Sequence, residues 1–547
     1  MRHAARFMPA SPADGPATAQ WWVLGTALLL TIWLVSGPLA ASTADHTKFK
    51  ELEGPFATGQ EVTEACLGCH TEAAAQLMQS PHWTWEYQDP VKGKPLGKKT
   101  MLNAFCIGHQ SNEAFCAACH AGYGWEDDQF DFTAERNVDC LVCHSAEEYV
   151  KPFGLAGHPA YERTEYPPDS GKFYEPTDLV AAARSVGVSS REACGSCHFY
   201  GGGGDGVKHG DLDSSLVDPG RELDVHMASD GLNFSCAQCH ETRDHKVPGS
   251  RLSMTASDAQ GPIMRGRKDD RNPASCQACH GERPHSGDLL HAERLNNHAH
   301  ILACQTCHIP TYARGGVPTR MAWDWSEATR MDGDGKPFML RNEQGHLVYD
   351  SRKGSFVPKE NVVPEYLWFD GSVDYIQPDA PVEPGQVFHV NRFRGTPGAE
   401  EARIWPVKKF SGRQPYDTEH RQLTVMQVAI PNDTSLWFNF DFTKAIEAGM
   451  AATGRPFSGE FDFVDTRMTW PITHMVAPAE DALACADCHR PGGRLDDVPG
   501  IWLPGRDSHP WVDGIGFGLA GLMLLGVAAH SGTRLVSRMR KRGAPHE

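Results

Sequence analysis

Positive charge is scarce in this sequence. The chain has 51 lysine and arginine residues against 69 aspartate and glutamate residues, which gives a formal net charge of −18. Nucleic-acid binding is therefore disfavoured, because phosphate backbones are bound by basic surfaces. A small protein that is neutral or positively charged would dock on this chain more readily than an acidic one.

Phosphate-binding loops and scattered cysteines are also missing. The glycine run at residues 201–204 precedes no helix signal, and the pattern of a phosphate-binding loop does not occur. No cysteine lies between residues 311 and 470, and only Cys106 of the 17 cysteines lies outside one repeated motif. The cysteine chemistry is therefore concentrated in that motif.

The motif is Cys-x-x-Cys-His, and it occurs eight times where chance predicts about 0.03 matches. Two thiols at this spacing add across the two vinyl groups of one haem, and the adjacent histidine reaches the iron as proximal ligand. Zinc would need two cysteine pairs per metal and no histidine after each pair, and a disulfide framework would need no histidine either. We therefore predict eight covalently bound c-type haems, numbered 1 to 8 in chain order. Their attachment residues are Cys66, Cys69 and His70; Cys116, Cys119 and His120; Cys140, Cys143 and His144; Cys194, Cys197 and His198; Cys236, Cys239 and His240; Cys276, Cys279 and His280; Cys304, Cys307 and His308; and Cys485, Cys488 and His489.

Both ends of the chain carry apolar runs. Residues 1–41 have the pattern of a signal peptide, with an apolar run at 21–35 and small residues near Ala41; an uncleaved anchor is the alternative. Residues 511–532 read as a transmembrane helix, with a buried core helix as the alternative. The tail, residues 533–547, is basic and is therefore expected in the cytoplasm. This orientation puts the haems on the periplasmic side of the bacterial inner membrane.

The spacing of the motifs divides the rest of the chain. Residues 42–310 hold haems 1 to 7, a density at which the haems themselves supply most of the buried apolar surface. Residues 311–470 are expected to be a haem-free insertion of loops, short strands and few helices that covers the haem core. Residues 471–510 hold haem 8. The predicted fold class is mainly α with extensive loops: a multihaem cytochrome c built around eight haems, with a C-terminal transmembrane helix.

Several helix boundaries can be predicted. The helix that carries Cys66 is expected to continue to Met78 and to end before Pro81, which would leave His82 on a loop. The helix that carries Cys140 is expected to run on through residue 149 and to end before Pro152. The best helix of the insertion spans residues 443–453, with residue 441 as its cap and residue 454, a glycine, as its stop.

Distal ligands must come from the nineteen histidines outside the motifs. A second histidine makes a six-coordinate electron-transfer haem, whereas an open or weakly held position makes a catalytic one. His300 competes with His298, and a solvated side chain is the alternative for each candidate. Seven histidines near the motifs are best placed, which would leave one haem different: His82, His209, His226, His245, His285, His298 and His474.

Cys106 indicates which haem differs. It lies ten residues before the second motif, and it is the single unpaired cysteine. A free thiol in an oxidising compartment can have a chemical role or can be a small buried apolar side chain, and its chemistry alone does not favour either.

Three stretches resemble the octahaem tetrathionate reductase family, within the wider group of hydroxylamine oxidoreductase and the multihaem nitrite reductases. They are Asn103-Ala-Phe-Cys106, the third motif followed by Glu148-Tyr-Val-Lys151, and TWPITHMVAPAEDALACADCH around the eighth motif. Seven clustered haems and a distant eighth add to the resemblance, which covers roughly residues 60–495. The Cys-x-x-Cys-Lys motif of ammonia-forming nitrite reductases is absent, and no tyrosine has the recognisable context of the cross-linked tyrosine of hydroxylamine oxidoreductase.

The resemblance implies an active site at haem 2. Lys151 would be its distal ligand, and Cys106, Asn103 and Glu148 would line the pocket. A calcium ion near this haem is left open, because metals lie there in some relatives. A plain surface lysine is the alternative for Lys151, although its position before a proline frees it from the helix surface.

The predicted function is that of a periplasmic, membrane-anchored oxidoreductase. It would reduce tetrathionate, with nitrite or hydroxylamine as other substrates, and take electrons from a periplasmic cytochrome or a membrane quinol dehydrogenase. A basic run could steer the anion inward, with a solvated loop as the alternative: Lys92, Lys94, Lys98 and Lys99. The rival hypothesis is a non-catalytic relay between a quinol-oxidising membrane partner and periplasmic acceptors, with all eight haems saturated by ligands.

Overall fold

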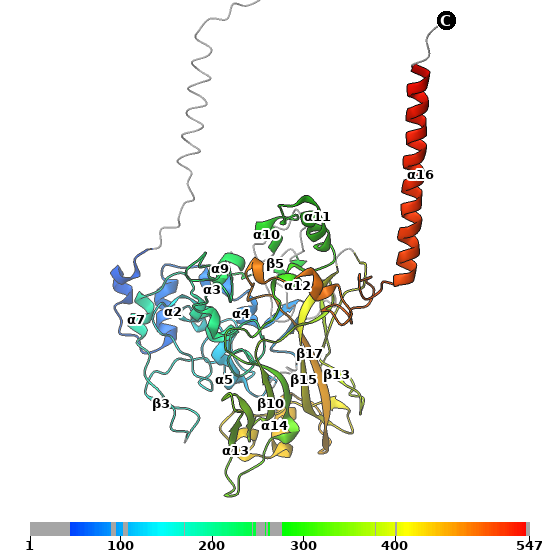
Figure 1. The fold of residues 1–547 in the computed structure, drawn as a ribbon. Helices are drawn as coiled ribbons and strands as arrows, with labels where there is room; N and C mark the ends of the chain where they lie inside the picture. The colour runs from blue at the N-terminus through cyan, green and yellow to red at the C-terminus, as the bar shows by residue number, and fades with distance from the viewer. Residues whose placement is uncertain are drawn as a thin grey trace, which may run out of the picture. The chain divides into compact units, whose positions relative to one another are not determined.

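The computed structural model describes most of the chain (Figure 1): residues 44–88, 95–101, 108–168, 170–242, 244–247, 257–258, 261–262, 276–377, 379–399 and 402–542. The chain divides into two compact units, Met1–Lys50 and Glu51–Glu547. In the first unit, residues 46–48 form the 3-10 helix η1 (His46–Lys48), which Asp45 caps by accepting a hydrogen bond from the Thr47 N–H at 3.1 Å. The second unit contains all eight motifs. The predicted signal peptide, residues 1–41, lies outside the described residues.

Short helices carry the cysteine motifs. Two cysteines three residues apart lie on one face of a helical turn, so a single turn can present both thiols to one haem. Most of these helices are hardly longer than the motif itself. They are α2 (Gly59–Leu67), α5 (Glu113–Cys116) with η3 (Ala117–Cys119), α6 (Leu141–His144), α8 (Arg191–His198), α9 (Cys236–Cys239), α10 (Cys276–His280), α12 (Cys304–His308) and α15 (Cys485–Cys488).

Two predicted helices are shorter than expected. The helix with Cys66 ends at Leu67, with Gly68 as its C-cap, and the chain resumes in α3 (Ala73–Leu77). Pro81 does not stop a helix but opens the next one, α4 (Pro81–Thr84), which contains His82. A proline suits the first helical position because its missing N–H would have no partner there.

The helix after Cys140 also ends early, at His144. The prediction that it runs on through residue 149 is wrong. Residues 149–151 leave the helix because the side chains of Tyr149 and Lys151 both turn back to Asp139, which directly precedes the motif.

The other helices pack around this framework. The predicted helix of the insertion is confirmed as α14 (Phe442–Ala452): the Asp441 side chain accepts the Lys444 N–H at 3.2 Å, and Gly454 follows with a φ of +63°. The remaining helical segments are η2 (Lys50–Leu52), η4 (Glu135–Asn137), α7 (Leu179–Arg184), η5 (Ser214–Leu216), α11 (Leu289–His298), η6 (Trp325–Glu327), α13 (Leu436–Asn439), η7 (Ala479–Asp481) and α16 (Pro510–Arg542).

A nine-stranded sheet fills the haem-free insertion. Its strands follow the order β13-β17-β15-β7-β10-β9-β8, and β11 and β16 pair with β15. The central strand β15 pairs with β17 in antiparallel register from Val407 opposite Pro471 to Asp417 opposite Phe461 (Figure 1). The strands are β7 (Thr319–Asp324), β8 (Met339–Arg341), β9 (Leu347–Asp350), β10 (Gly354–Lys359), β11 (Glu365–Phe369), β13 (Phe388–His389), β15 (Arg403–Asp417), β16 (Gln422–Leu423) and β17 (Phe461–Pro471).

Four two-stranded ribbons complete the strands. They pair β1 (Glu86–Gln88) with β2 (Pro95–Gly97), β3 (Thr164–Glu165) with β4 (Phe173–Tyr174), β5 (Ser257–Asp258) with β6 (Gly261–Pro262), and β12 (Val373–Tyr375) with β14 (Asn391–Phe393).

The insertion is hydrogen-bonded to the haem-bearing region at several places, among them the segment before the second motif and the seventh motif itself. Asn112, which is fully buried just before the second motif, donates to the Met426 carbonyl at 2.9 Å and accepts the Val428 N–H at 2.7 Å. At the seventh motif, the Thr306 hydroxyl donates to the Ile404 carbonyl at 2.7 Å. The insertion therefore contacts the segment of the second motif directly.

The last helix, α16, is long and apolar enough over Pro510–Arg540 to cross a membrane, judged by length and composition. Its side chains are exposed along this stretch. This agrees with the apolar C-terminal helix of the predicted fold class.

Candidate active site

Six of the predicted distal histidines lie opposite a motif histidine. The ring centres of each pair are 5.9 to 6.4 Å apart. The pairs are His82 with His198, His245 with His144, His226 with His280, His474 with His240, His285 with His308, and His298 with His489.

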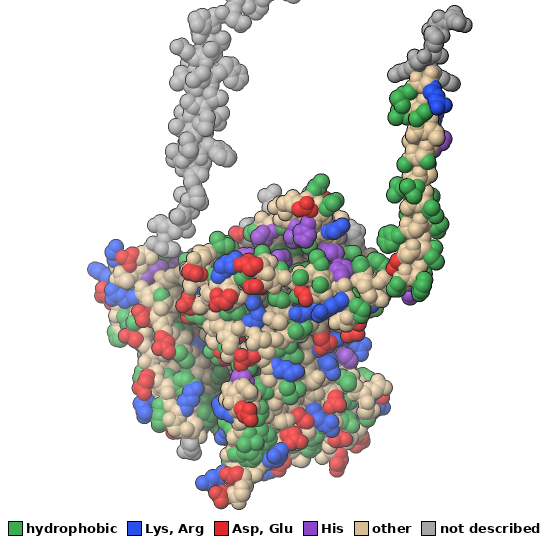
Figure 2. Space-filling view, viewed as in Figure 1, with side chains coloured by type: hydrophobic (Ala, Val, Ile, Leu, Met, Phe, Trp, Pro, Cys, Tyr) green, Lys and Arg blue, Asp and Glu red, His purple; other side chains and the backbone are tan. Residues whose placement is uncertain are grey.

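This separation fits an iron atom between two imidazoles. About 2 Å for each iron–nitrogen bond and about 1 Å from each nitrogen to its ring centre give about 6 Å in total. The residues present therefore fit haems 3 to 8, each held by its motif and by one distal histidine. Histidine side chains gather on the visible face of Figure 2 over the region of α10, α11 and α12.

The choice between His298 and His300 follows from burial. His298, at the end of α11, faces His489 with ring centres 5.9 Å apart, whereas His300 is exposed. The seventh candidate, His209, packs its ring against Trp470 at 4.8 Å. That His209 is a distal ligand stays a prediction.

Thiols of different motifs lie side by side. Hydrogen bonds join Cys66 to Cys140, Cys119 to Cys197, Cys194 to Cys236, and Cys276 to Cys304. The second motif is thus next to the fourth, and the fourth is next to the fifth. The fold brings the motifs together in an order that differs from their order in the chain.

His120, the motif histidine of haem 2, has different surroundings. It is fully buried, and every ring that contacts it among the described residues belongs to a tryptophan or a phenylalanine. Its Nε2 lies 2.7 Å from the Trp83 carbonyl oxygen. The surrounding rings are those of Trp83, Trp85, Trp125, Phe130 and Phe132, called the aromatic cage below.

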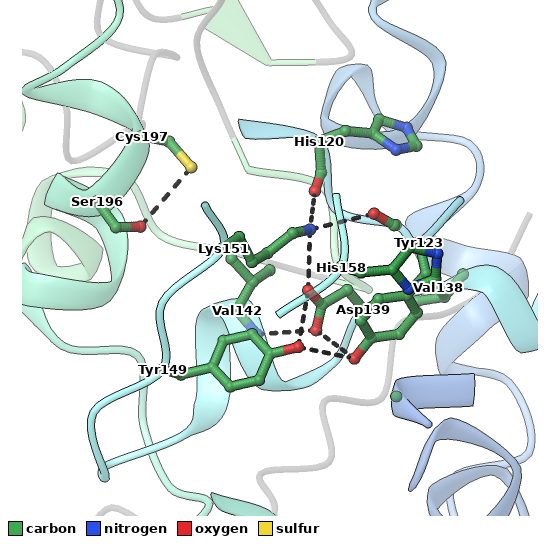
Figure 3. A network of polar contacts seen from close by, with 12 residues as sticks. His120, Tyr123, Val138, Asp139, Val142, Tyr149, Lys151, His158, Ser196 and Cys197 are labelled. Atoms are coloured by element: carbon green, nitrogen blue, oxygen red, sulfur yellow. Dashed lines mark hydrogen bonds and ion pairs between the residues drawn. The ribbon is translucent and has the colours of Figure 1, made fainter. Parts of the chain in front are cut away.

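A buried ion pair lies beside this motif (Figure 3). The Lys151 ammonium is 2.9 Å from Asp139 Oδ2, and the two side chains are 2% and 0% exposed. The same ammonium donates to the carbonyl oxygens of His120 at 2.6 Å and of Gly122 at 3.1 Å. Lys151 thereby joins the segment of the second motif to that of the third.

Asp139 is held by further donors. Its Oδ1 accepts the Tyr123 hydroxyl at 2.7 Å and the Val142 N–H at 3.1 Å, and its Oδ2 accepts the Tyr149 hydroxyl at 3.4 Å. Burial, together with the negative charge of Asp139, raises the pKa of Tyr123 and Tyr149 well above the ordinary value. Both tyrosines therefore remain protonated donors to the carboxylate.

The predicted catalytic residues are placed in different ways. Lys151 is buried next to haem 2's motif, but it contacts the backbone of His120, whose ring points away from it in Figure 3. Glu148 is exposed, and the carboxylate that pairs with Lys151 is that of Asp139. Asn103 and Cys106 lie outside the described residues.

Asp139 was not predicted, because the resemblance placed the acidic residue at Glu148, in the stretch that ends at Lys151. The available signal was an acidic residue directly before a Cys-x-x-Cys-His motif. An aspartate there can accept the N–H of the residue three positions later and so cap the motif's first turn.

Part of the basic run lies over the aromatic cage. The Lys98 ammonium is 4.4 Å from the centre of the Trp85 ring, and that of Lys99 is 4.2 Å from the Phe132 ring. His109 is buried between Trp85 and Trp125, with ring centres 4.9 and 4.4 Å away. Lys92 and Lys94 lie outside the described residues.

For calcium, the described residues contain no group of three or more histidine, cysteine, aspartate or glutamate side chains arranged to hold a metal ion. The calcium ion, which the sequence left open, therefore gains no support from these side chains.

Comparison with known proteins shows that the chain is similar to c-type cytochromes. Residues 320–492 match a family model described as bacterial cytochrome c. The crystal structure of octaheme cytochrome c from Shewanella oneidensis is 37% identical, with a TM-score of 0.71, and the match covers 86% of this chain and 98% of that chain. An uncharacterized protein of Archaeoglobus fulgidus is 22% identical over 258 residues, which are 40% of this chain and 84% of that protein.

Proposed function

The chain belongs to the octahaem c-type cytochromes, and we propose that it is a reductase with its active site at haem 2. Its cofactor is haem c, which carries one electron. Where the haem iron has a protein ligand on one side only, its sixth coordination position is available to a substrate. Eight such haems match the eight motifs.

The observation that carries the proposal is the contrast between His120 and the other motif histidines. Six motif histidines face a second imidazole, the arrangement of a saturated electron-transfer haem. His120 is instead enclosed by the aromatic cage, and a buried lysine is bonded to its backbone. A site that lacks a fixed second histidine is the one that can accept a substrate.

Lys151 supplies positive charge at this site. Asp139 and two backbone carbonyls hold its ammonium, so little reorganisation is needed when a negative charge arrives. In this proposal Lys151 would hold the distal position of haem 2 in the resting protein as a neutral amine, released from these three acceptors. When the substrate arrives, Lys151 would return to Asp139 as the ammonium seen in the structure.

Cys106 supplies the sulfur chemistry. Its thiolate attacks one of the two central sulfur atoms of tetrathionate, the central S–S bond breaks, and one thiosulfate leaves. The cysteine then carries a thiosulfate through a new S–S bond. Two electrons, delivered one at a time, break that bond and release the second thiosulfate and the free thiolate. Asn103 and Glu148 are proposed to line the pocket.

Electrons are proposed to reach haem 2 from haem 4. The Cys119 thiol contacts Cys197 of the fourth motif, and the Cys194 thiol contacts Cys236 of the fifth. Contacts of this kind support close approach of successive haems. Haem 2 would then be the last haem on one branch of the electron-transfer chain, which suits a site where a substrate is reduced.

The substrate is proposed to be a small anion: tetrathionate first, and nitrite or hydroxylamine as alternatives. Lys98 and Lys99 over the aromatic cage offer positive charge in a chain of net charge −18. They would attract an anion that the rest of the surface repels.

The location is proposed to be the periplasmic side of the inner membrane. α16 would anchor the chain there, and a membrane quinol dehydrogenase or a periplasmic cytochrome would donate the electrons.

A non-catalytic relay is the second candidate. The six histidine pairs favour it, because saturated haems transfer electrons without binding substrate. In that case haem 2 would also be saturated and no substrate would be reduced at a useful rate.

Steady-state turnover distinguishes these functions. Reduced viologen is the donor, and tetrathionate, nitrite and hydroxylamine are compared side by side. We expect tetrathionate reduction, and we expect Cys106→Ala to lower it by more than about tenfold, or 1.4 kcal/mol in the barrier. Nitrite and hydroxylamine turnover in the same variant is the control and should change less. Turnover of none of the three would support the relay, and full tetrathionate turnover in Cys106→Ala would remove this residue from the mechanism.

A further inference from the structure

His474, which faces the motif histidine of haem 5, is held by a buried carboxylate. Asp211 Oδ2 lies 3.2 Å from His474 Nδ1 and accepts the backbone N–H of His474 at 3.0 Å and of Thr473 at 2.8 Å. The Asp211 side chain is 2% exposed, and its Oδ1 has no hydrogen-bond partner in the part of the chain that the structure describes. The Thr473 hydroxyl also lies 3.1 Å from His474 Nδ1.

We propose that Asp211 is a positioning residue that lowers the reduction potential of haem 5 through its hydrogen bond to His474. The inference rests on the assignment of His474 as the distal ligand of haem 5, which is part of the proposed function. It does not rest on any substrate.

The physical reason is that the two ring nitrogens of His474 have different roles: Nδ1 donates a hydrogen bond, and Nε2 is free to bind iron. With Nδ1–H donated to Asp211, Nε2 is left as the nitrogen that faces His240, whose ring centre is 6.4 Å away. A carboxylate that accepts Nδ1–H makes the imidazole a stronger base. A more basic ligand stabilises ferric iron over ferrous iron, so the potential falls.

Two other distal histidines have neutral acceptors at the same position. His245 Nδ1 lies 2.9 Å from the neutral amide oxygen of Gln76, and His285 Nδ1 lies 3.2 Å from that of Asn296. The nearest comparison is Asp224, whose Oδ1 is 3.8 Å from His226 Nδ1, which is too long for a hydrogen bond. The two oxygens of Asp224 accept the backbone N–H groups of His226, Met227 and Val476 instead.

A second buried charge balances Asp211. Lys408 is fully buried and donates to the carbonyl oxygens of Val207 at 2.9 Å and Lys208 at 3.0 Å, and to the Thr319 hydroxyl at 2.6 Å. That hydroxyl already donates to the Gly206 carbonyl at 2.8 Å, so it accepts from Lys408. Three acceptors around one nitrogen require the ammonium form. Burial lowers the pKa of Lys408, and the negative charge of Asp211 opposes this shift.

Asp211→Asn is the test variant. The asparagine oxygen can still accept the two backbone N–H groups, so the loop keeps its shape while the carboxylate charge is lost. Asp224→Asn is the comparison variant, because it removes a buried carboxylate beside another distal histidine without breaking a hydrogen bond to the ring. It also loses one backbone acceptor, since both oxygens of Asp224 accept N–H groups. The readouts are the midpoint potentials from a spectroelectrochemical titration and the low-spin ferric signals from electron paramagnetic resonance of the holoprotein.

In Asp211→Asn we expect one midpoint potential to rise by about 59 mV or more. That figure is the one-electron equivalent of a tenfold change, the low end of what groups hydrogen-bonded to a metal ligand contribute. One low-spin signal should shift with it, and it should be the signal that is lost in His474→Ala, not the one lost in His209→Ala. Asp224→Asn should give a smaller rise.

Unchanged potentials in Asp211→Asn, or a rise no larger than that of Asp224→Asn, would overturn the inference and leave the proposed reductase intact. If His474→Ala lost no low-spin signal, the ligand assignment would fail and the inference with it. Absence of tetrathionate turnover would contradict the proposed function but not this inference, because none of these readouts involves substrate.

Discussion

The Lys151–Asp139 pair is costly to bury. Removing two charges from water is offset only when the geometry is good and the remaining lone pairs and protons are satisfied. Here the carboxylate also accepts two tyrosine hydroxyls and a backbone N–H, and the ammonium also donates to two carbonyls. The pair is therefore fully bonded, and each partner depends on the other.

Asp139→Ala is expected to destabilise the protein by about 3–5 kcal/mol, because it leaves the Lys151 ammonium buried without its counter-charge. The midpoint of guanidinium chloride denaturation of the holoprotein measures this. Adding Lys151→Met should recover part of the loss. The exposed ion pair of Arg221 and Glu480, at 2.7 Å, provides the control, and Glu480→Gln should leave the midpoint unchanged. Equal effects in Asp139→Ala and Glu480→Gln would contradict a structural role for the buried pair.

At the scale of elements, most of the distal histidines that face the motifs lie on segments far from those motifs in the sequence. His474 follows β17 and faces the fifth motif, and His82 in α4 faces the fourth. Helix α11 allows a direct comparison of two nearby histidines. His298 at its C-terminal end faces His489, whereas His300 just beyond the helix is exposed.

Replacing His298 should therefore affect one haem. In His298→Ala we expect one low-spin ferric signal to be lost and one high-spin signal to appear in electron paramagnetic resonance, because the iron of haem 8 loses its sixth ligand. His300→Ala should leave the spectrum as in the wild type. The reverse outcome would exchange the two assignments.

The sequence predicted features that depend on local chemistry. Attachment motifs, the cap and stop of α14 and the candidate distal histidines follow from residue type and spacing. The pairing of each histidine with a motif could not be predicted, because it is set by tertiary contacts between segments such as β17 and α9. The length of β15 was also missed. Pro406 and Pro415 lie inside it, and prolines in a sequence argue against a long central strand.

The site was only partly predictable for the same reason. Lys151 came from resemblance to a known family, and its burial agrees with a role at haem 2. Its partner Asp139 lies twelve positions earlier and meets it only because the chain leaves α6 at His144 and turns back. The resemblance pointed to Glu148 instead, which is exposed.

At the scale of the whole molecule, contacts between motifs bring distant segments of the chain together, and the second motif differs from the six motifs whose histidines face a second imidazole. Thiol contacts link the second motif to the fourth and the fourth to the fifth, while the insertion that carries the sheet bonds to Asn112 just before the second motif. The lysines over the aromatic cage place positive charge near the second motif in a chain of net negative charge. All of these features converge on haem 2.

Electron paramagnetic resonance of the fully oxidised holoprotein tests this central claim most directly. The account predicts seven haems with signals of two histidine ligands and one haem with a different signal. Lys151→Met should alter only the different one, and addition of tetrathionate to the wild type should perturb the same signal. Eight haems with two histidine ligands each, unchanged in Lys151→Met, would contradict the proposal that haem 2 is a substrate-binding site.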